Sequence, residues 1–209
     1  MCDANCPCSK HGRTLDFPRR MTRASRIERL DYLKDQLRKR VVILDGAMGT
    51  NIQKFRLEEE DYRGERFADA ARYPNDLKNN NDLLVLTRPE IILDIHRRFL
   101  DTGRADILET CTFGATSIGQ HDYFWHRPEE GRRKDQEYFQ EVVDAPELKA
   151  LVRDLNMAAS ALARQACDEA EASDGRPRFV AGSIGPMPVT CSLSPDCLLY
   201  TSPSPRDRT

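Results

Sequence analysis

Three short apolar runs alternate along this chain with longer stretches in which apolar residues recur every three or four positions. The runs cover residues 41–44, 105–108 and 179–181. Each is too short for a helix and is uninterrupted by polar residues or nearly so, which predicts a strand buried on both faces. The periodic stretches between them predict helices, so we expect parallel β-α-β units.

Three helices are expected from periodicity and from their end signals. The first begins at Ser25, which has a glutamate three residues later as in a capping box, and it ends in the basic residues 38–40. The second follows Thr87, again with a glutamate three residues later, and stops near Gly103. The third covers residues 146–172.

Two insertions interrupt this alternation. Residues 51–82 form a long polar excursion after the first strand, which we interpret as a structured loop. Residues 125–145 are highly charged, and we interpret them as a solvated insertion.

Composition narrows the class of protein. The 209 residues carry 32 basic and 34 acidic side chains, a net charge of −2, which argues against a dedicated nucleic-acid binder. No apolar stretch approaches the roughly 20 residues that span a bilayer, and the first 20 residues lack the apolar core of a secretory signal. Seven cysteines without such a signal favour reduced thiols. We therefore expect a cytoplasmic protein that binds neither nucleic acid nor a membrane.

The first 24 residues show no period and predict a disordered arm. This arm contains four potential metal ligands, Cys2, Cys6, Cys8 and His11. Their spacing lacks paired Cys-x-x-Cys knuckles, so an exposed, solvated tail is favoured over a zinc site.

Carboxylates follow two of the predicted strands. Asp45 comes after the first strand and Glu109 after the second, so both are expected at the carboxyl edge of the sheet, where ligands bind in parallel α/β folds. The turn at residues 46–50 offers backbone N–H groups to a ligand carboxylate. Together they fit an α-amino acid, whose ammonium would pair with the carboxylates. A purely structural role, with Asp45 capping the turn and Glu109 paired to a basic neighbour, is equally compatible with the spacing.

Other chemistries find less support. The turn at residues 46–50 matches no phosphate-binding glycine motif, and Asp45 would repel a phosphate. No nucleophile–histidine arrangement can be read from the spacing. His96 and His121 are interpreted as ordinary surface or packing histidines.

Five ordered blocks of the chain carry a resemblance to a known family: Leu44–Thr50, Asn80–Leu84, Thr87–Ile91, Ala105–Phe113 apart from Cys111, and Phe179–Pro186. Together these blocks resemble the homocysteine-binding domain of cobalamin-dependent methionine synthase. A further stretch, Glu58–Phe67, resembles that large enzyme more than the short methyltransferases that use S-methylmethionine or betaine.

This resemblance implies a (β/α)8 TIM barrel, of which only about the first three βα units are present. It implies transfer of a methyl group from methylcobalamin, supplied by 5-methyltetrahydrofolate, to the homocysteine thiol, giving methionine. In the family zinc favours the thiolate, since a free thiol with a pKa near 8.5 is largely protonated at pH 7. The positions carried over as homocysteine-binding are Asp45, Gly46, Gly49, Thr50 and Glu109.

The chain also departs from the family. The segments that hold the family's three zinc cysteines are absent, and Cys111 stands where the family usually has asparagine. Neither Cys111 nor Cys191 is an evident replacement ligand, because isolated thiols do not make a tetrahedral site. We expect no zinc or cobalamin to bind this chain, and we expect it to be inactive alone.

A full barrel needs roughly 250 residues, so the sequence predicts a fragment. We expect a disordered arm at 1–24, a partial homocysteine-binding domain at 25–196 and a non-native tail at 197–209. The expected partners are homocysteine and the cobalamin and folate modules of a full-length enzyme. The alternatives are a short homocysteine S-methyltransferase with another methyl donor, and a non-catalytic chain that binds an amino acid or a partner protein.

Overall fold

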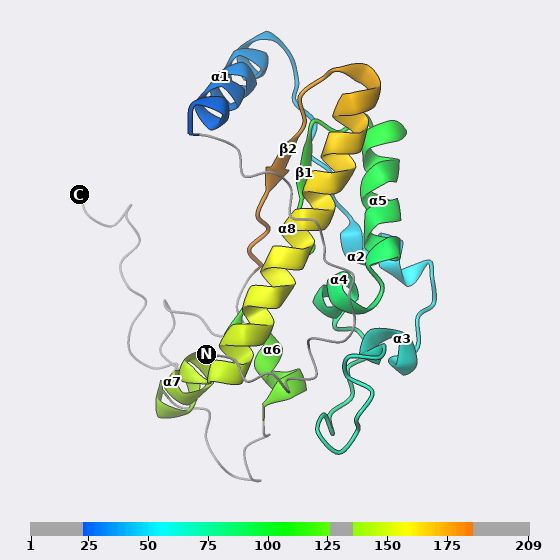
Figure 1. The fold of residues 1–209 in the computed structure, drawn as a ribbon, viewed down its shortest axis with the longest axis vertical. Helices are drawn as coiled ribbons and strands as arrows, with labels where there is room; N and C mark the ends of the chain where they lie inside the picture. Colours follow the sequence, from blue (N-terminus) through cyan, green and yellow to red (C-terminus); the bar gives the residue numbers. More distant parts are fainter. Residues whose placement is uncertain (1–22, 126–135, 186–209) are drawn as a thin grey trace, which may run out of the picture.

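The computed structural model describes residues 23–125 and 136–185 of the protein. Two helices dominate this part of the chain. The long helix α8 (Pro146–Asp174) lies beside α5 (Pro89–Asp101), and α8 also packs against a short parallel sheet (Figure 1). Helix α1 (Arg23–Lys39) lies across one end of the strands, and α6 (Ser117–Phe124) and α7 (Gln136–Asp144) gather toward the opposite end of α8.

The sheet confirms the predicted parallel α/β arrangement. Strands β1 (Ile107–Glu109) and β2 (Phe179–Ala181) are parallel, and Leu108 lies opposite Val180. Leu44 adds an isolated parallel bridge to Ile107. The prediction for β2 is confirmed residue for residue, whereas β1 begins two residues later than the apolar run suggested. A closed barrel is not formed by residues 23–125 and 136–185, so it stays a prediction for a complete domain.

The prediction of a buried strand at residues 41–44 is wrong. This segment makes one bridge only, and Val41 and Ile43 are 82% and 43% exposed. Ile43 accepts hydrogen bonds from the N–H groups of Asp106 and Ile107, so one edge of the segment is joined to β1. Val42 is half-buried, whereas Val41, Ile43 and Leu44 are exposed to solvent.

Helix α1 begins at Arg23, two residues before the predicted start. Ser25 therefore lies inside the helix and is not its N-cap. The apolar residues of α1 are also largely uncovered, since Ile27, Leu30 and Leu37 are all exposed. Polar contacts hold the helix instead: the Arg29 guanidinium donates to the Glu171 carboxylate and to the carbonyl oxygen of Arg178.

Helix α5 begins at Pro89, its N1 residue, and the N-cap residue Arg88 makes no side-chain capping hydrogen bond. The predicted capping box at Thr87 is wrong, because Thr87 ends the preceding helix α4 (Leu84–Thr87) and its hydroxyl donates to the carbonyl oxygen of Leu83. The predicted stop at Gly103 is confirmed to within two residues, since α5 ends at Asp101.

Helix α8 confirms the third predicted helix and extends it by two residues. It stops at Gly175, whose φ of 72° lies in the left-handed region that glycine adopts without strain. Alanines on its inner face, Ala158, Ala159 and Ala163, are buried and allow neighbouring helices to approach closely. Leu155 anchors the main core together with apolar residues of α4 and α5.

The excursion at residues 51–82 is structured, as predicted. It contains helix α2 (Met48–Gln53) at its start, helix α3 (Glu59–Arg63), and the 3-10 turn η2 (Asn81–Leu83) at its end. The Arg63 guanidinium donates to three backbone carbonyls of this loop, and the Glu59 carboxylate accepts from the N–H groups of Leu77 and Lys78. Side chains therefore supply the hydrogen bonds that a regular element would make.

The prediction of a solvated insertion at 125–145 is wrong for its described second half. Helix α7 buries Tyr138 and Val142 against Ile118 and Trp125, because its apolar residues recur on one helical face. The arm residues 1–22, with their cysteines and His11, lie outside the described ranges, as do Cys191 and the tail 197–209. No helix that the structure describes is long and apolar enough to cross a membrane.

Candidate amino-acid-binding site

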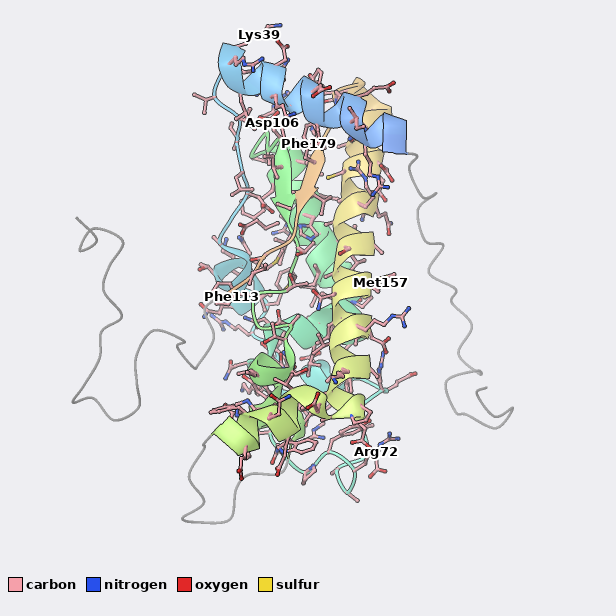
Figure 2. All side chains as sticks on the ribbon, turned by 90° about the vertical axis from the view of Figure 1, so that its left-hand side faces the viewer. Lys39, Arg72, Asp106, Phe113, Met157 and Phe179 are labelled. Atoms are coloured by element: carbon pink, nitrogen blue, oxygen red, sulfur yellow. The ribbon has the colours of Figure 1, made fainter. Side chains whose placement is uncertain are left out.

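A cavity of about 500 Å³ opens at the carboxyl ends of the strands. Its walls come from the turn into α2, the loop that leads into η2, the segment after β1, and α6. Phe113, labelled in Figure 2, lies on the wall that follows β1, far along the strands from Asp106 and α1. A volume of this size is typical of small-molecule sites.

Asp45 lies at the cavity but is already engaged. Its side chain is 3% exposed, and its carboxylate accepts the Glu109 backbone N–H at 2.6 Å. Its own N–H donates to the carbonyl oxygen of Ile107. Asp45 thus joins the first strand segment to the end of β1. This is a structural role, but it differs from the capping of the turn that the sequence left open, since no side chain caps α2.

Glu109 has a different environment. It is the last residue of β1, half-buried, and it lines the same cavity as Asp45. Within the described part of the chain, no hydrogen bond or ion pair engages its carboxylate, so the expected basic neighbour is not found there. The two predicted carboxylate residues therefore lie together, and only the Asp45 carboxylate has a hydrogen-bond partner among the described residues.

The turn after Asp45 presents backbone donors. Ala47 adopts a left-handed conformation with φ of 52°, and α2 begins at the next residue. The N–H groups of residues 46–50 make no hydrogen bond to any described residue. Of the three turn residues proposed to bind homocysteine, Gly46 and Gly49 line the cavity, whereas Thr50 is exposed and does not line it.

A buried polar cluster forms one wall of the cavity and was not assigned a role from the sequence. The Asp82 carboxylate accepts from the Gly114 N–H at 3.0 Å and from Gln120 Nε2 at 3.4 Å, and Asn80 Nδ2 donates to Gln120 Oε1 at 2.7 Å. Burial raises the pKa of Asp82 to about 6. The available signal was a carboxylate directly before the apolar run Leu83–Leu86.

Cys111 lines the cavity, as expected from its place in the sequence. Its thiol donates to the carbonyl oxygen of Asn81 at 3.7 Å, and burial raises its pKa. Cys167 is buried elsewhere, and burial raises its pKa to about 12. Residues 23–125 and 136–185 contain no group of three His, Cys, Asp or Glu side chains that could hold a metal ion. These residues therefore do not fit a zinc ion.

The two histidines that were interpreted as surface or packing residues, His96 and His121, are both buried. His121 packs against the rings of Tyr138 and Phe139, which confirms its interpretation as a packing residue. His96 lies behind Asp45 on the buried face of α5, with its Nδ1 atom 3.9 Å from Asp45 Oδ2.

The fold and the cavity together define an α/β protein with a cavity at the carboxyl edge of its parallel strands, the edge where ligands bind in folds of this class. The model of the family described as homocysteine S-methyltransferase matches residues 42–206, which is most of the chain. The chain belongs to this family.

Two crystal structures of the homocysteine methyltransferase MmuM from Escherichia coli are similar to the chain. The metallated form has a TM-score of 0.46 and the oxidized form 0.47, each at 22% identity over 74% of this chain. The alignments cover 41% and 40% of the two MmuM chains, so the protein spans about two fifths of their length.

Proposed function

We propose that this chain carries the homocysteine-binding part of a methyltransferase domain. The observation that carries the proposal concerns Glu109, which lines the cavity beside Asp45 and whose carboxylate has no partner among the described residues. A half-buried carboxylate without a protein partner is free to pair with a ligand, and an ammonium group is a suitable partner.

The cavity offers complementary groups for both ends of an amino acid. The Glu109 carboxylate accepts hydrogen bonds from the ammonium, with the negative charge of Asp45 directly behind it. The N–H groups of residues 46–50 donate to the ligand carboxylate. The apolar side chains of Met48 and Phe113 on the cavity wall leave room for the thioalkyl side chain.

The reaction of the complete protein is methylation of the homocysteine thiol to give methionine. We favour methylcobalamin as the donor because Glu58–Phe67, which forms α3 and the loop after it, resembles the cobalamin-dependent enzyme. The two described thiols, Cys111 and Cys167, are buried in separate places and do not form a set of zinc ligands. This chain alone is expected to bind homocysteine without methylating it, and a cytoplasmic location stays a prediction.

Isothermal titration calorimetry of the 209-residue chain with L-homocysteine tests binding. We expect saturable binding to the wild type and a Kd at least tenfold higher for Glu109→Gln, because a charge-assisted hydrogen bond is lost while the shape of the side chain is kept. Glu28→Gln is the matched control, since Glu28 is exposed on α1, away from the cavity.

Two further titrations make the result specific. Homocysteine lacking its ammonium, as 4-mercaptobutyrate, should not bind measurably. Equal affinities of wild type and Glu109→Gln would overturn the assignment of Glu109, and no binding of homocysteine to the wild type would overturn the proposed function itself.

The exposed apolar segment at residues 41–44 favours a second candidate function, namely binding of a partner protein at the edge of the sheet. Sedimentation velocity of the purified chain, with and without homocysteine, separates the two. A stable complex that forms without homocysteine and is lost in Val41→Lys would favour the second candidate.

A further inference from the structure

The His96 side chain is fully buried, yet neither of its ring nitrogens has a hydrogen-bond partner in the described part of the chain. Only one other buried side-chain atom there, Nε of Arg178, shares this condition. Buried polar groups are almost always paired, and an exception needs a physical explanation.

The nearest charged group to the ring is part of the cavity. His96 Nδ1 lies 3.9 Å from Oδ2 of Asp45, while Oδ1 of the same carboxylate accepts the Glu109 N–H at 2.6 Å. One carboxylate oxygen is therefore held by the backbone of β1, and the other faces the histidine without reaching it. A movement of about 1 Å would bring Nδ1 and Oδ2 to hydrogen-bond distance.

We propose that His96 is a positioning residue of the amino-acid site, an inference that rests on the proposed function. The imidazole carries a proton on Nδ1, the ring nitrogen nearest Asp45, and this N–H donates a hydrogen bond to Oδ2 of Asp45 when the ligand ammonium occupies the cavity. The carboxylate is then held from both sides, by α5 through His96 and by β1 through Glu109. This fixes the negative charge of Asp45 and the backbone of Glu109 where the ammonium binds.

A packing role and a positioning role differ in their consequences. If His96 only fills space, an apolar residue of similar volume removes two unpaired nitrogens and stabilises the protein without changing ligand affinity. If His96 positions Asp45, the same substitution raises thermal stability but weakens homocysteine binding. Gain of stability with loss of affinity is characteristic of strain kept for function.

The binding test uses His96→Leu and His96→Asn, each with its melting temperature and its Kd for homocysteine. We expect His96→Leu to melt no lower than the wild type and to bind about tenfold more weakly. His96→Asn places an amide donor near the position of Nδ1 and should bind within about threefold of the wild type. In an Asp45→Asn background, His96→Leu should cause no further loss.

The second measurement does not depend on the ligand. The chain has four histidines, so the ring nitrogen signals of ¹⁵N-histidine-labelled protein can be assigned to His96 by their absence in His96→Leu. We expect the neutral tautomer with the proton on Nδ1, and a shift of this signal in Asp45→Asn. A proton on Nε2, or a signal that Asp45→Asn leaves unchanged, would overturn the inference.

The binding test and the NMR measurement together distinguish failure of the proposed function from failure of the positioning role. If the wild type does not bind homocysteine, the proposed function fails, and the NMR signal alone then decides whether the ring is coupled to Asp45. If the wild type binds and His96→Leu binds equally well, the proposed function stands and the positioning role is refuted.

Discussion

The two ends of the short parallel sheet differ in whether their carboxylates are paired. At the amino end, beneath α1, the Asp106 carboxylate accepts hydrogen bonds from Arg40, Arg176 and the N–H of Ile43 (Figure 2). At the carboxyl end, Glu109 faces the cavity without a partner among the described residues, and the ring of His96 has no hydrogen bond.

The difference shows which charges serve folding and which are left for a ligand. The Arg40 guanidinium, with Arg176, holds the pKa of Asp106 at about 2, so the paired form is strongly favoured in the folded state. Burial without a cation instead raises the pKa of Asp82 to about 6. The carboxylate at the amino end is therefore paired with cations, whereas the cavity end retains polar groups without a partner among the described residues.

The largest effect on stability is expected from removing the Asp106 charge at the amino end of the sheet. Asp106→Asn should lower the free energy of unfolding at pH 7 by about 3 kcal/mol, because Arg40 and Arg176 lose a buried carboxylate. Because the folded-state pKa is depressed, this contribution is present above about pH 4 and is lost as the pH falls toward 2. Urea denaturation at several pH values measures it, and a cost that does not shrink at low pH would contradict the ion-pair explanation.

A pH-dependent effect of nearly the same size is expected at the cavity end. Because the folded-state pKa of Asp82 is raised, ionisation costs stability, and the cost grows as the pH rises from about 4 to 6. Relative to Asp82→Asn, the wild type should therefore lose about 2 kcal/mol of unfolding free energy over this range. Parallel urea titrations of both proteins at pH 4, 5, 6 and 7 provide the comparison; parallel curves would show that Asp82 titrates normally.

A much smaller stability effect is expected at Glu109. Since no described residue pairs with its carboxylate, Glu109→Gln should change the free energy of unfolding by less than about 0.5 kcal/mol while weakening homocysteine binding. Chemical denaturation without ligand, set beside the calorimetric Kd, sharpens the contrast with Asp106. A destabilisation as large as that of Asp106→Asn would mean that Glu109 is structural.

The smallest effect belongs to an exposed pair on α1. Lys39 Nζ lies 2.7 Å from Asp35 Oδ2, four residues apart on the helix, with both side chains largely in solvent. Asp35→Asn should lower the free energy of unfolding by about 0.4 kcal/mol, and this difference should vanish in 1 M salt. Thermal denaturation at low and high salt checks this and calibrates the buried ion pair at Asp106.

The sequence predicted elements well where the local pattern and the tertiary environment agree. Helix α8 has a long apolar stripe and a left-handed glycine stop, and β2 is a short apolar run bounded by polar residues; both were found in place. The segment at residues 41–44 has the same apolar signal but is exposed, because burial depends on what lies on its other side. The capping-box spacing at Ser25 and at Thr87 also predicted helix N-caps that the structure does not contain at these residues.

The candidate site was predictable only in part. The positions of Asp45 and Glu109 at strand ends were enough to predict that these two residues lie close together. It could not show that Asp45 would be engaged by the Glu109 N–H, or that Asp82 and His96 would be buried beside the cavity. Those residues lie on other elements, and their proximity depends on how α5 and the loop before η2 pack.

Asp45 links the register of the first strand segment to the integrity of the cavity. Its N–H binds the carbonyl oxygen of Ile107, and its carboxylate binds the N–H of Glu109. A slip of one residue would turn the carboxylate to the opposite face. A ligand held at Glu109 therefore also fastens an otherwise exposed segment, so amide hydrogen exchange at Asp45 should slow when homocysteine binds, as a local opening reaction becomes less frequent.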